Sequence, residues 1–450
     1  MNRAFPTTLL MLGIAVVAAF AASSVYPWPE AVVISDAVGK PLFDGFDTRN
    51  VRSIRVAIYN EDRNEIERLL VRRKGEEWVL PTHSNFVADN GLQLGAIVNL
   101  LLDKTVLEKR SDNQEDHLKY GVVDPADFSS GVNRSSLGKK ISLSDRNNKE
   151  LASLIVGLPL KNDPKRLKHY VRIPGQPSVY VVDIDPRGIN PDFTAWVSPN
   201  LLKLSKSSRL KDVTVDSYRM DLKEIEQASH NVSYRSQIVV GEQKVDVILE
   251  TATEDGELNE VKPDEAQLKA IQLSAGSITS IPFSGVVAKN KLAAKSLRKP
   301  NNESEKSAFD SMKNRGFLAT EFDNETWQFD STGGSVAVRT ADGVVITLHI
   351  GAIDNQTRNN SLKLNHYLML VAGVDESLIP APEKPEAAND DSGDKEAQKV
   401  HLRKVAERDR QLQIGRQRAA ALNESFSRWY YIISEDTVAR LRPELKGTDL

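Results

Sequence analysis

The sequence predicts an α+β fold of two tandem, repeated, mainly antiparallel sheet domains with helices. An N-terminal membrane helix precedes them, and a charged helical insert lies near the C-terminus. Two observations favour the repeat. The stretch LKHYVRIPGQPSVYVV at 167–182 recurs as LNHYLMLVAG at 364–373, and this second copy resumes only at 428–433 with RWYYII. Landmark residues also keep their order in both halves, and such self-similarity indicates repeated structural units.

Four landmarks pair the two halves of the chain. They are Gly121 with Gly316, Gly157 with Gly351, His169-Tyr170 with His366-Tyr367, and Tyr180 with Tyr430. We therefore expect a first α+β repeat over residues 50–205 and a second over 210–450. The second repeat would be interrupted at 380–426, because a hairpin loop tolerates a long insertion at a small entropic cost.

The first repeat opens with strands and a helix. Apolar and polar residues alternate at 51–60, which predicts a half-buried strand, and 68–81 predicts a hairpin that turns at a lysine-glycine pair. Apolar residues recur at helical spacing within 91–104, and Asp89 or Asn90 is placed to cap that helix.

The rest of the first repeat is predicted to be mostly strands. The stretch HLKYGVVDP at 117–125 ends the helical region. Two hairpins are then expected, at 139–157 and at 169–184. Residues 193–204, FTAWVSPNLLKL, close the repeat.

The second repeat is predicted to follow the same plan. A strand at 213–222, a hairpin at 236–250 and a helix at 265–281 come first, and SMKNRGFLAT at 311–320 takes the place of 117–125. Three segments are expected to form the middle strands: 326–331, 335–340 and 344–351.

The insert has two predicted parts, a linker at 380–398 and a basic helix at 399–426. The linker is rich in proline, acidic and small residues, and the helix in strong helix formers. Six cations of the helix are candidates for contact with a partner: Arg403, Lys404, Arg408, Arg410, Arg416 and Arg418. The helix is either a solvated element or one that docks on a partner or a membrane surface.

Residues 1–28 predict an export signal. One cation, Arg3, precedes an apolar stretch from Leu9 to about Ala22, and Tyr26 and Trp28 follow it as interfacial residues. The segment is a signal anchor or a cleaved signal peptide, and we favour the anchor. We therefore expect a single-pass inner-membrane protein with most of the chain on the extracytoplasmic, periplasmic side.

The composition excludes several kinds of site. The chain has no cysteine, so it holds no disulfide, thiolate metal site or cysteine nucleophile. Its net charge of −3 gives no steering towards nucleic acid, and we expect no nucleic-acid partner. No phosphate loop, dinucleotide fingerprint, serine elbow or H-E-x-x-H motif is present. We predict no catalytic residue, no cofactor and no metal, and hence no enzyme.

Two histidines occupy matching places in the repeats, His169 and His366. They are either a symmetric ligand or proton-transfer pair, or hairpin residues that pack on a neighbouring strand. The tryptophans Trp78, Trp196, Trp327 and Trp429 are predicted to pack in cores or between layers.

The order of several motifs resembles the domain of unknown function 4340 family. The motifs stand at Trp78–Pro81, Leu118–Pro125, Leu154–Gly157, His169–Arg172, Tyr180–Val182 and Phe193–Leu204. The resemblance implies one N-terminal membrane segment and an association with ABC-transporter permeases of the gliding-motility type, and it assigns no catalytic residue. The chain departs from the family in its basic insert at 381–424. The second repeat also has no tryptophan before its helix and carries Pro282 in the helix region.

These observations predict a membrane-tethered, extracytoplasmic, non-catalytic accessory or scaffold protein of an ABC-type transport complex. Exposed strand edges and the insert would contact the permease or auxiliary subunits. The alternative is an export-linked binding protein for a polysaccharide or a lipid. A third possibility, an unrecognised hydrolase, has no matched triad or carboxylate pair in its favour.

Overall fold

The computed structural model describes residues 36–448 with gaps. The gaps fall at 44, 46, 90, 129–132, 162, 166, 205–208, 221–231, 242–243, 291–302, 324–325, 355–363 and 384–390. The predicted membrane helix at 1–28 lies outside the described residues. Within the part that is described, no helix is long and apolar enough to cross a membrane.

The chain divides by contacts into two compact units. The first comprises Met1–Leu70 and Leu92–Pro191, and the second comprises Val71–Gly91 and Asp192–Leu450. The segment 71–91 therefore packs with the second unit, although it precedes most of the first in sequence. The predicted repeat limits of 50–205 and 210–450 stay predictions.

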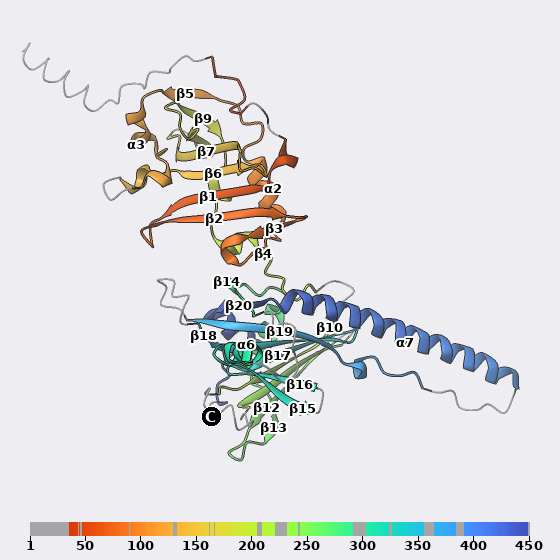
Figure 1. Cartoon of the computed structure of the whole chain (residues 1–450). Helices are drawn as coiled ribbons and strands as arrows, with labels where there is room; N and C mark the ends of the chain where they lie inside the picture. The colour runs from red at the N-terminus through yellow and green to blue at the C-terminus, as the bar shows by residue number, and fades with distance from the viewer. Residues whose placement is uncertain are drawn as a thin grey trace, which may run out of the picture. The chain divides into compact units, whose positions relative to one another are not determined.

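The first sheet has nine strands in the order β4-β3-β2-β1-β6-β7-β8-β9-β5 (Figure 1). The strand pairs β1–β6, β2–β3, β3–β4, β5–β9, β6–β7, β7–β8 and β8–β9 are all antiparallel. The strands are β1 (Ser53–Asn60), β2 (Glu65–Lys74), β3 (Glu77–Leu80), β4 (Phe86–Val87), β5 (Glu108–Ser111), β6 (Lys139–Ser144), β7 (Glu150–Pro159), β8 (Lys168–Arg172) and β9 (Val179–Asp183).

The second sheet also has nine strands, in the order β13-β12-β11-β10-β17-β18-β19-β20-β14. They are β10 (Leu210–Ser217), β11 (Tyr234–Val240), β12 (Val245–Ala252), β13 (Leu258–Val261), β14 (Gly285–Ala288), β17 (Ser335–Thr340), β18 (Val344–Ile353), β19 (Asn365–Val374) and β20 (Trp429–Ser434). The strands β15 (Phe317–Asp323) and β16 (Thr326–Ser331) form a separate two-stranded sheet.

The two large sheets have the same strand order. Strands β10–β14 take the places of β1–β5, and β17–β20 take the places of β6–β9. The prediction of an α+β protein with two mainly antiparallel sheets is therefore confirmed. The expectation that 326–331 form a middle strand is wrong, because β16 pairs with β15, the strand directly before it.

Matched glycines support the same correspondence in atomic detail. A Cβ on Gly157 would lie 2.4 Å from the backbone oxygen of Tyr120, and one on Gly351 would lie 2.3 Å from that of Arg315. Each repeat therefore uses a glycine to let the turn after a helix approach the sheet.

The tyrosine landmark needs a correction. Counted from the two histidines, the strand register aligns Tyr180 with Tyr431, one residue beyond the predicted Tyr430. A one-residue shift moves a strand side chain to the other face of the sheet. Accordingly Tyr430 lies in a core cluster with Phe317 and Tyr367, whereas Tyr431 faces the opposite side.

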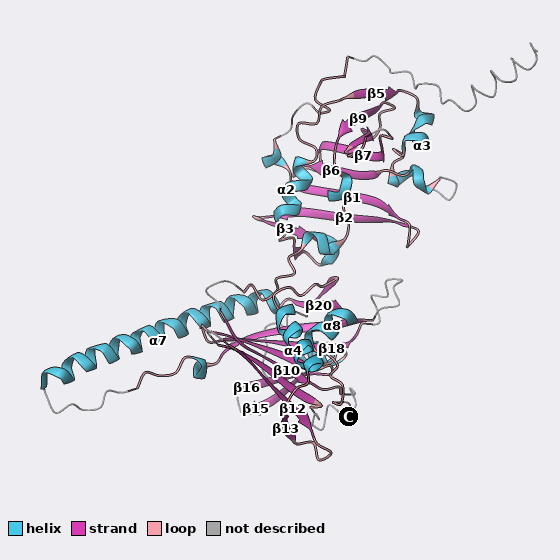
Figure 2. Cartoon of the chain, turned by 180° about the vertical axis from the view of Figure 1, so that it is seen from behind, coloured by secondary structure: helices cyan, strands magenta, loops and turns pink. Residues whose placement is uncertain are grey.

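Helices cover both faces of the second sheet. Figure 1 shows α6 on one side, and Figure 2, from behind, shows α4 and α8 on the other, where they contact each other and the sheet. Among the described residues, the α-helices of both units are α2 (Gly91–Asn99), α3 (His117–Tyr120), α4 (Glu265–Ser277), α6 (Glu303–Lys313), α7 (Asp391–Phe426) and α8 (Glu435–Leu441). A capping box of Asp264 and Gln267 begins α4.

The insert enters and leaves the second sheet between two paired strands, β19 and β20. Its helix α7 begins at Asp391 rather than at the predicted 399, and has 36 residues. One stripe of α7 is buried, at positions three or four residues apart: Leu412, Gly415, Ala419, Leu422 and Phe426. This C-terminal half packs on the sheet, and the N-terminal half extends beyond the strands (Figures 1 and 2).

Candidate functional site

The second unit contains an open pocket with a volume of about 1060 Å³. Its lining comes from four parts of that unit: the segment 71–91, residues 198–203, the end of β14, and the junction of α7 with β20. The aromatic lining residues are Phe86, Trp429 and Tyr431. The polar ones include Ser84, Asn85, Asp89, Ser198, Asn200, Lys203, Lys289, Glu424, Ser425, Ser427 and Arg428.

Strand alternation places the aromatic floor of the pocket. On β20, Trp429 and Tyr431 point to the pocket side, while Tyr430 between them faces the core. Phe86 of β4 lies edge-on to both, with ring centroids 5.3 Å from Trp429 and 6.3 Å from Tyr431. Phe283 packs against two rings of the floor, with its centroid 5.2 Å from that of Tyr431 and 5.8 Å from that of Phe86.

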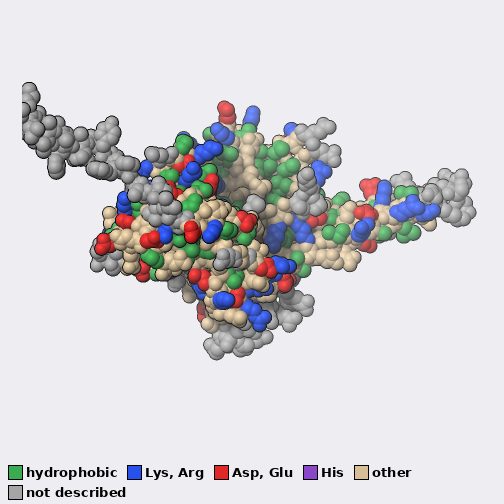
Figure 3. Space-filling view, turned by 90° about the horizontal axis from the view of Figure 1, so that it is seen from above, with side chains coloured by type: hydrophobic (Ala, Val, Ile, Leu, Met, Phe, Trp, Pro, Cys, Tyr) green, Lys and Arg blue, Asp and Glu red, His purple; other side chains and the backbone are tan. Residues whose placement is uncertain are grey.

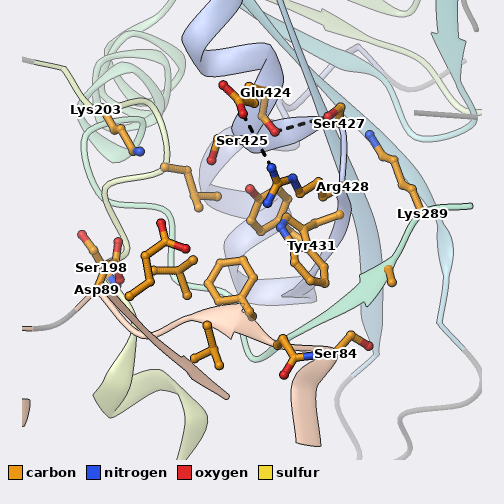
Figure 4. A pocket seen from close by; sticks show the side chains of 18 of the residues that line it. Ser84, Asp89, Ser198, Lys203, Lys289, Glu424, Ser425, Ser427, Arg428 and Tyr431 are labelled. Atoms are coloured by element: carbon orange, nitrogen blue, oxygen red, sulfur yellow. Dashed lines mark hydrogen bonds and ion pairs between the residues drawn. The ribbon is translucent and has the colours of Figure 1, made fainter. Parts of the chain in front are cut away.

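Polar groups line the walls of the pocket (Figure 4). The Oδ1 of Asp89 accepts a hydrogen bond from the backbone nitrogen of Ser198 at 2.5 Å, so this predicted helix-cap residue ties the segment 71–91 to 192–203. The other cap candidate, Asn90, lies outside the described residues. The Arg428 guanidinium lies 3.6 Å from the Glu424 carboxylate, beside Tyr431.

Backbone strain gathers at the pocket. Ser84 and Asn85 have φ of 57° and 63°, and Lys203 has φ of 47°. They are three of the six non-glycine residues with positive φ in the described chain. Such conformations cost on the order of 1 kcal/mol each and cluster at functional sites. The lysine is the most informative, because asparagine adopts this region far more readily.

Lys289 lies at the edge of the pocket, directly after β14. Its Nζ donates to the backbone oxygen of Phe426 at 3.2 Å, at the C-terminal end of α7, where a cation is favoured. The same Nζ lies 5.1 Å from the ring centroid of Tyr430. Burial lowers the pKa of Lys289 to about 7.

A buried histidine lies close to this lysine. His349 of β18 is 5% exposed, and its Nδ1 has no hydrogen-bond partner among the described residues. Burial, and secondarily the charge of Lys289, lowers the pKa of His349 to about 4. The register aligns His349 with Ile155 of the first sheet, so the second repeat holds a polar group where the first is aliphatic.

The six predicted contact residues of α7 fall into two sets. Arg408 donates to the backbone oxygen of Ile379 at 2.8 Å, Arg416 pairs with Glu376 at 2.5 Å, and Arg418 pairs with Asp342 at 2.7 Å. These three hold α7 to its own unit.

The second set comprises Arg403, Lys404 and Arg410. They are exposed, and the described residues offer them no ion pair or hydrogen bond. Figure 3 shows Lys and Arg side chains along the projecting part of α7. Of the six predicted residues, these three make no ion pair or hydrogen bond with the described part of the chain.

The two matched histidines lie in different units and make different contacts. The Nδ1 of His169 lies 3.3 Å from the backbone oxygen of Leu167. The Nε2 of His366 lies 2.6 Å from the Glu435 carboxylate, at the start of α8. Each ring therefore contacts groups of its own repeat, which fits the packing interpretation of these residues.

No group of three histidine or acidic side chains that could hold a metal ion occurs among the described residues. The polar side chains of the pocket instead supply hydrogen-bond donors and acceptors of both charges. This arrangement can bind a polar ligand.

Comparison with known proteins gives a family. The family model described as Domain of unknown function (DUF4340) matches residues 78–300. The chain belongs to this family through those residues. The DUF4340 match takes in the pocket segments around Phe86, Asp89, Ser198 and Lys289, and it ends before α7.

Two further comparisons found nothing. No curated protein matches the chain. No solved structure matches it either.

Sequence patterns missed the pocket residues. Trp429 was predicted to pack in a core or between layers; it is half-buried, packs against Phe86 and also lines the pocket. Lys289 directly follows the apolar strand β14, and His349 lies within the apolar strand β18, so neither residue belongs to a motif. The available signal was the apolar sequence around these residues. A polar or charged side chain that is buried among apolar ones needs a hydrogen-bond or ion-pair partner, which marks it as unusual.

Proposed function

We propose that this DUF4340 protein is a non-catalytic accessory protein, tethered to the inner membrane by its N-terminal segment, with its bulk on the periplasmic side. It docks an ABC-type transport complex through α7, as a scaffold. The partner that binds α7 is an acidic helical segment of a transporter subunit. The projecting half of α7 carries this proposal.

A second stripe runs along α7 on the side opposite the buried one. Val400, Arg403, Glu407, Arg410 and Ile414 recur three or four residues apart and lie about 160–240° around the helix from Leu412. Val400 and Ile414 are 42% and 49% exposed. This spacing is that of a helix that packs on another helix.

Charge selects the partner of this stripe. It has two unpaired arginines and one acid, and Lys399 and Lys404 are exposed nearby. An acidic partner helix would complement that charge and meet the two apolar side chains between the cations. Tethering to the same membrane would raise the local concentration of the two partners.

A site-specific cross-link tests the proposal. A photo-crosslinking residue at Gln417, which is exposed and lies three residues beyond Ile414 of this stripe, is expected to capture a permease or ATPase subunit in intact membranes. The same residue at Lys269 of α4, also exposed, is the positional control and is expected to capture none.

A charge-matched pair of variants completes the test. R403E/R410E is expected to reduce the Gln417 cross-link at least tenfold, and K262E/K269E, which changes the net charge equally, is expected to leave it unchanged. Equal cross-linking in both variants would contradict the docking function. Loss of binding to protein-free anionic vesicles, with the cross-link intact, would assign α7 to the membrane surface instead.

A second candidate function is that of a binding protein for a polysaccharide or a lipid. The pocket beside Trp429 favours it, because an aromatic floor with polar walls is the usual build of a ligand site. The two candidates use different residues, so each can fail without the other.

A further inference from the structure

The pocket of the second unit points to one class of ligand. We propose that it binds a short, uncharged oligosaccharide, with one sugar ring on the indole of Trp429 and its hydroxyl groups on the polar walls. This inference rests on the second candidate function and is independent of α7 docking. It names the ligand class that the binding protein takes.

The floor of the pocket suits a ligand with an apolar face. Trp429 is half-buried, and its ring packs against Phe86, which also contacts Tyr431. A half-exposed indole offers a flat apolar surface together with one N–H donor. A pyranose ring has such an apolar face, formed by its C–H groups, with hydroxyl groups around its edge.

The walls supply hydrogen-bond partners in number. The hydroxyl or amide side chains are Ser84, Asn85, Ser198, Asn200, Ser425 and Ser427. Among the described residues, no hydrogen bond occupies the side-chain amides of Asn85 and Asn200. Side-chain amides both donate and accept, which matches a sugar hydroxyl that does the same.

The charges of the pocket argue against an ionic ligand. Four cations, Lys74, Lys203, Lys289 and Arg428, face three acids, Glu77, Asp89 and Glu424. Arg428 is paired with Glu424, and Lys289 bonds the end of α7. The remaining charges nearly cancel, so the site selects neither a strong anion nor a cation.

The shape of the pocket argues against an acyl chain. A lipid tail needs a continuous apolar channel, whereas the aromatic floor here is ringed by polar side chains (Figure 4). The volume of about 1060 Å³ is slightly above the range of roughly 300–1,000 Å³ for small-molecule sites, which leaves room for a few sugar rings.

The strained backbone supports a ligand site independently of the side chains that line the pocket. Ser84, Asn85 and Lys203 all hold positive φ at the rim of this one pocket. A strained backbone persists where the surrounding structure fixes it, and it pre-organises the side chains that it carries. These three residues therefore have a fixed backbone conformation at the pocket, which supports a ligand site there.

The test uses the full chain in detergent and four neutral probes: maltotriose, cellotriose, mannotriose and tri-N-acetylchitotriose. Titration calorimetry and tryptophan fluorescence are expected to detect at least one of them at millimolar concentration. The binding constant of that probe is expected to fall at least tenfold in Trp429→Leu and severalfold in Asn200→Ala.

Two further variants and a stability measurement serve as controls for Trp429→Leu. Trp78→Phe changes a tryptophan on the opposite face of β3 from the pocket residues Glu77 and Val79 and is expected to bind normally. Asn200→Ala removes an exposed rim side chain, so it tests the site even where Trp429→Leu lowers stability. A urea unfolding curve for each variant separates loss of binding from loss of fold.

The possible results distinguish a wrong ligand class from a wrong binding function. Binding of no trisaccharide, with Trp429-dependent binding of phosphatidylglycerol micelles, would overturn the ligand class and keep the binding function. Trp429-independent binding, or no binding of either class, would overturn both.

Discussion

The guanidinium group of Arg418 on α7 lies 2.7 Å from the carboxylate of Asp342, in the turn between β17 and β18. The two side chains are 17% and 16% exposed. Thr340 donates to the same carboxylate at 2.5 Å. This cluster fixes the point at which the inserted helix leaves the sheet.

Removal of the cation should destabilise the second unit. We expect Arg418→Ala to lower the free energy of unfolding by about 2 kcal/mol, because a largely buried carboxylate loses its partner. Arg416→Ala removes an ion pair whose side chains are 61% and 52% exposed and should cost no more than about 0.5 kcal/mol. Urea unfolding measures both, and equal losses would contradict the assigned role.

Gly415 lets α7 approach the same turn. A Cβ on this residue would lie 2.4 Å from the backbone oxygen of Asp342. We expect Gly415→Ala to cost about 2 kcal/mol despite the better helix propensity of alanine. Gly276 in α4 has nothing within 4 Å of such a Cβ, and Gly276→Ala should gain up to about 1 kcal/mol. A gain in both variants by thermal unfolding would show that α7 does not pack as described.

The matched glycines of the two repeats should behave alike. Gly157→Ala and Gly351→Ala each place a methyl group against a backbone oxygen, and each should cost at least about 2 kcal/mol. Gly373 lies in β19 with open space around it, so Gly373→Ala should change stability by less than about 0.5 kcal/mol. Chemical denaturation of the three variants checks this, and tolerance at one matched position alone would break the equivalence.

His349 should make the stability of the chain depend on pH. Its pKa is about 4 in the folded chain and about 6.5 when unfolded. Between those values only the unfolded chain takes up the proton, so stability falls as pH falls from 6.5 to 4, by up to about 3 kcal/mol. Below pH 4 this group causes no further loss.

The substitution His349→Ile checks that dependence with the residue that the first repeat carries. We expect the variant to lose most of the difference in unfolding free energy between pH 6.5 and 4.5. The wild-type chain, measured by the same urea titrations, should keep it. An unchanged difference in the variant would mean that other groups cause the acid sensitivity.

Much of the fold could be predicted because its signals are local. The strand at 51–60 follows from its alternation, and the helix in 265–281 from its place in the second repeat. The duplication was inferred from recurring glycines, of which Gly121 and Gly316 both have positive φ, and from the histidine-tyrosine pair that recurs in β8 and β19. The long hairpin insertion between β19 and β20 followed from the same comparison.

Errors arose where the partner of a segment decides its place. Residues 326–331 alternate like any strand, and only their pairing with 317–323 removes them from the main sheet. The start of α7 at Asp391 was hidden because an acidic, small-residue stretch has the composition of a linker as well as of a helix start.

The pocket was beyond sequence reasoning for a different reason. Its floor joins Phe86 to Trp429, more than three hundred residues apart in the chain. No spacing rule connects them. The alternation at Trp429-Tyr430-Tyr431 leaves open which side chains face the core, and the register that decides this comes from β14 and β19.

The position of α7 between two adjacent strands has a consequence for the evolution of the chain. Because β19 and β20 pair directly, the insert leaves and rejoins the sheet at neighbouring points. The half of α7 that extends beyond the strands does not pack on the sheet. A lineage could lengthen, trim or replace the part before Leu412 while it keeps the buried stripe from there to Phe426. Partner choice could then diverge among descendants without a new fold.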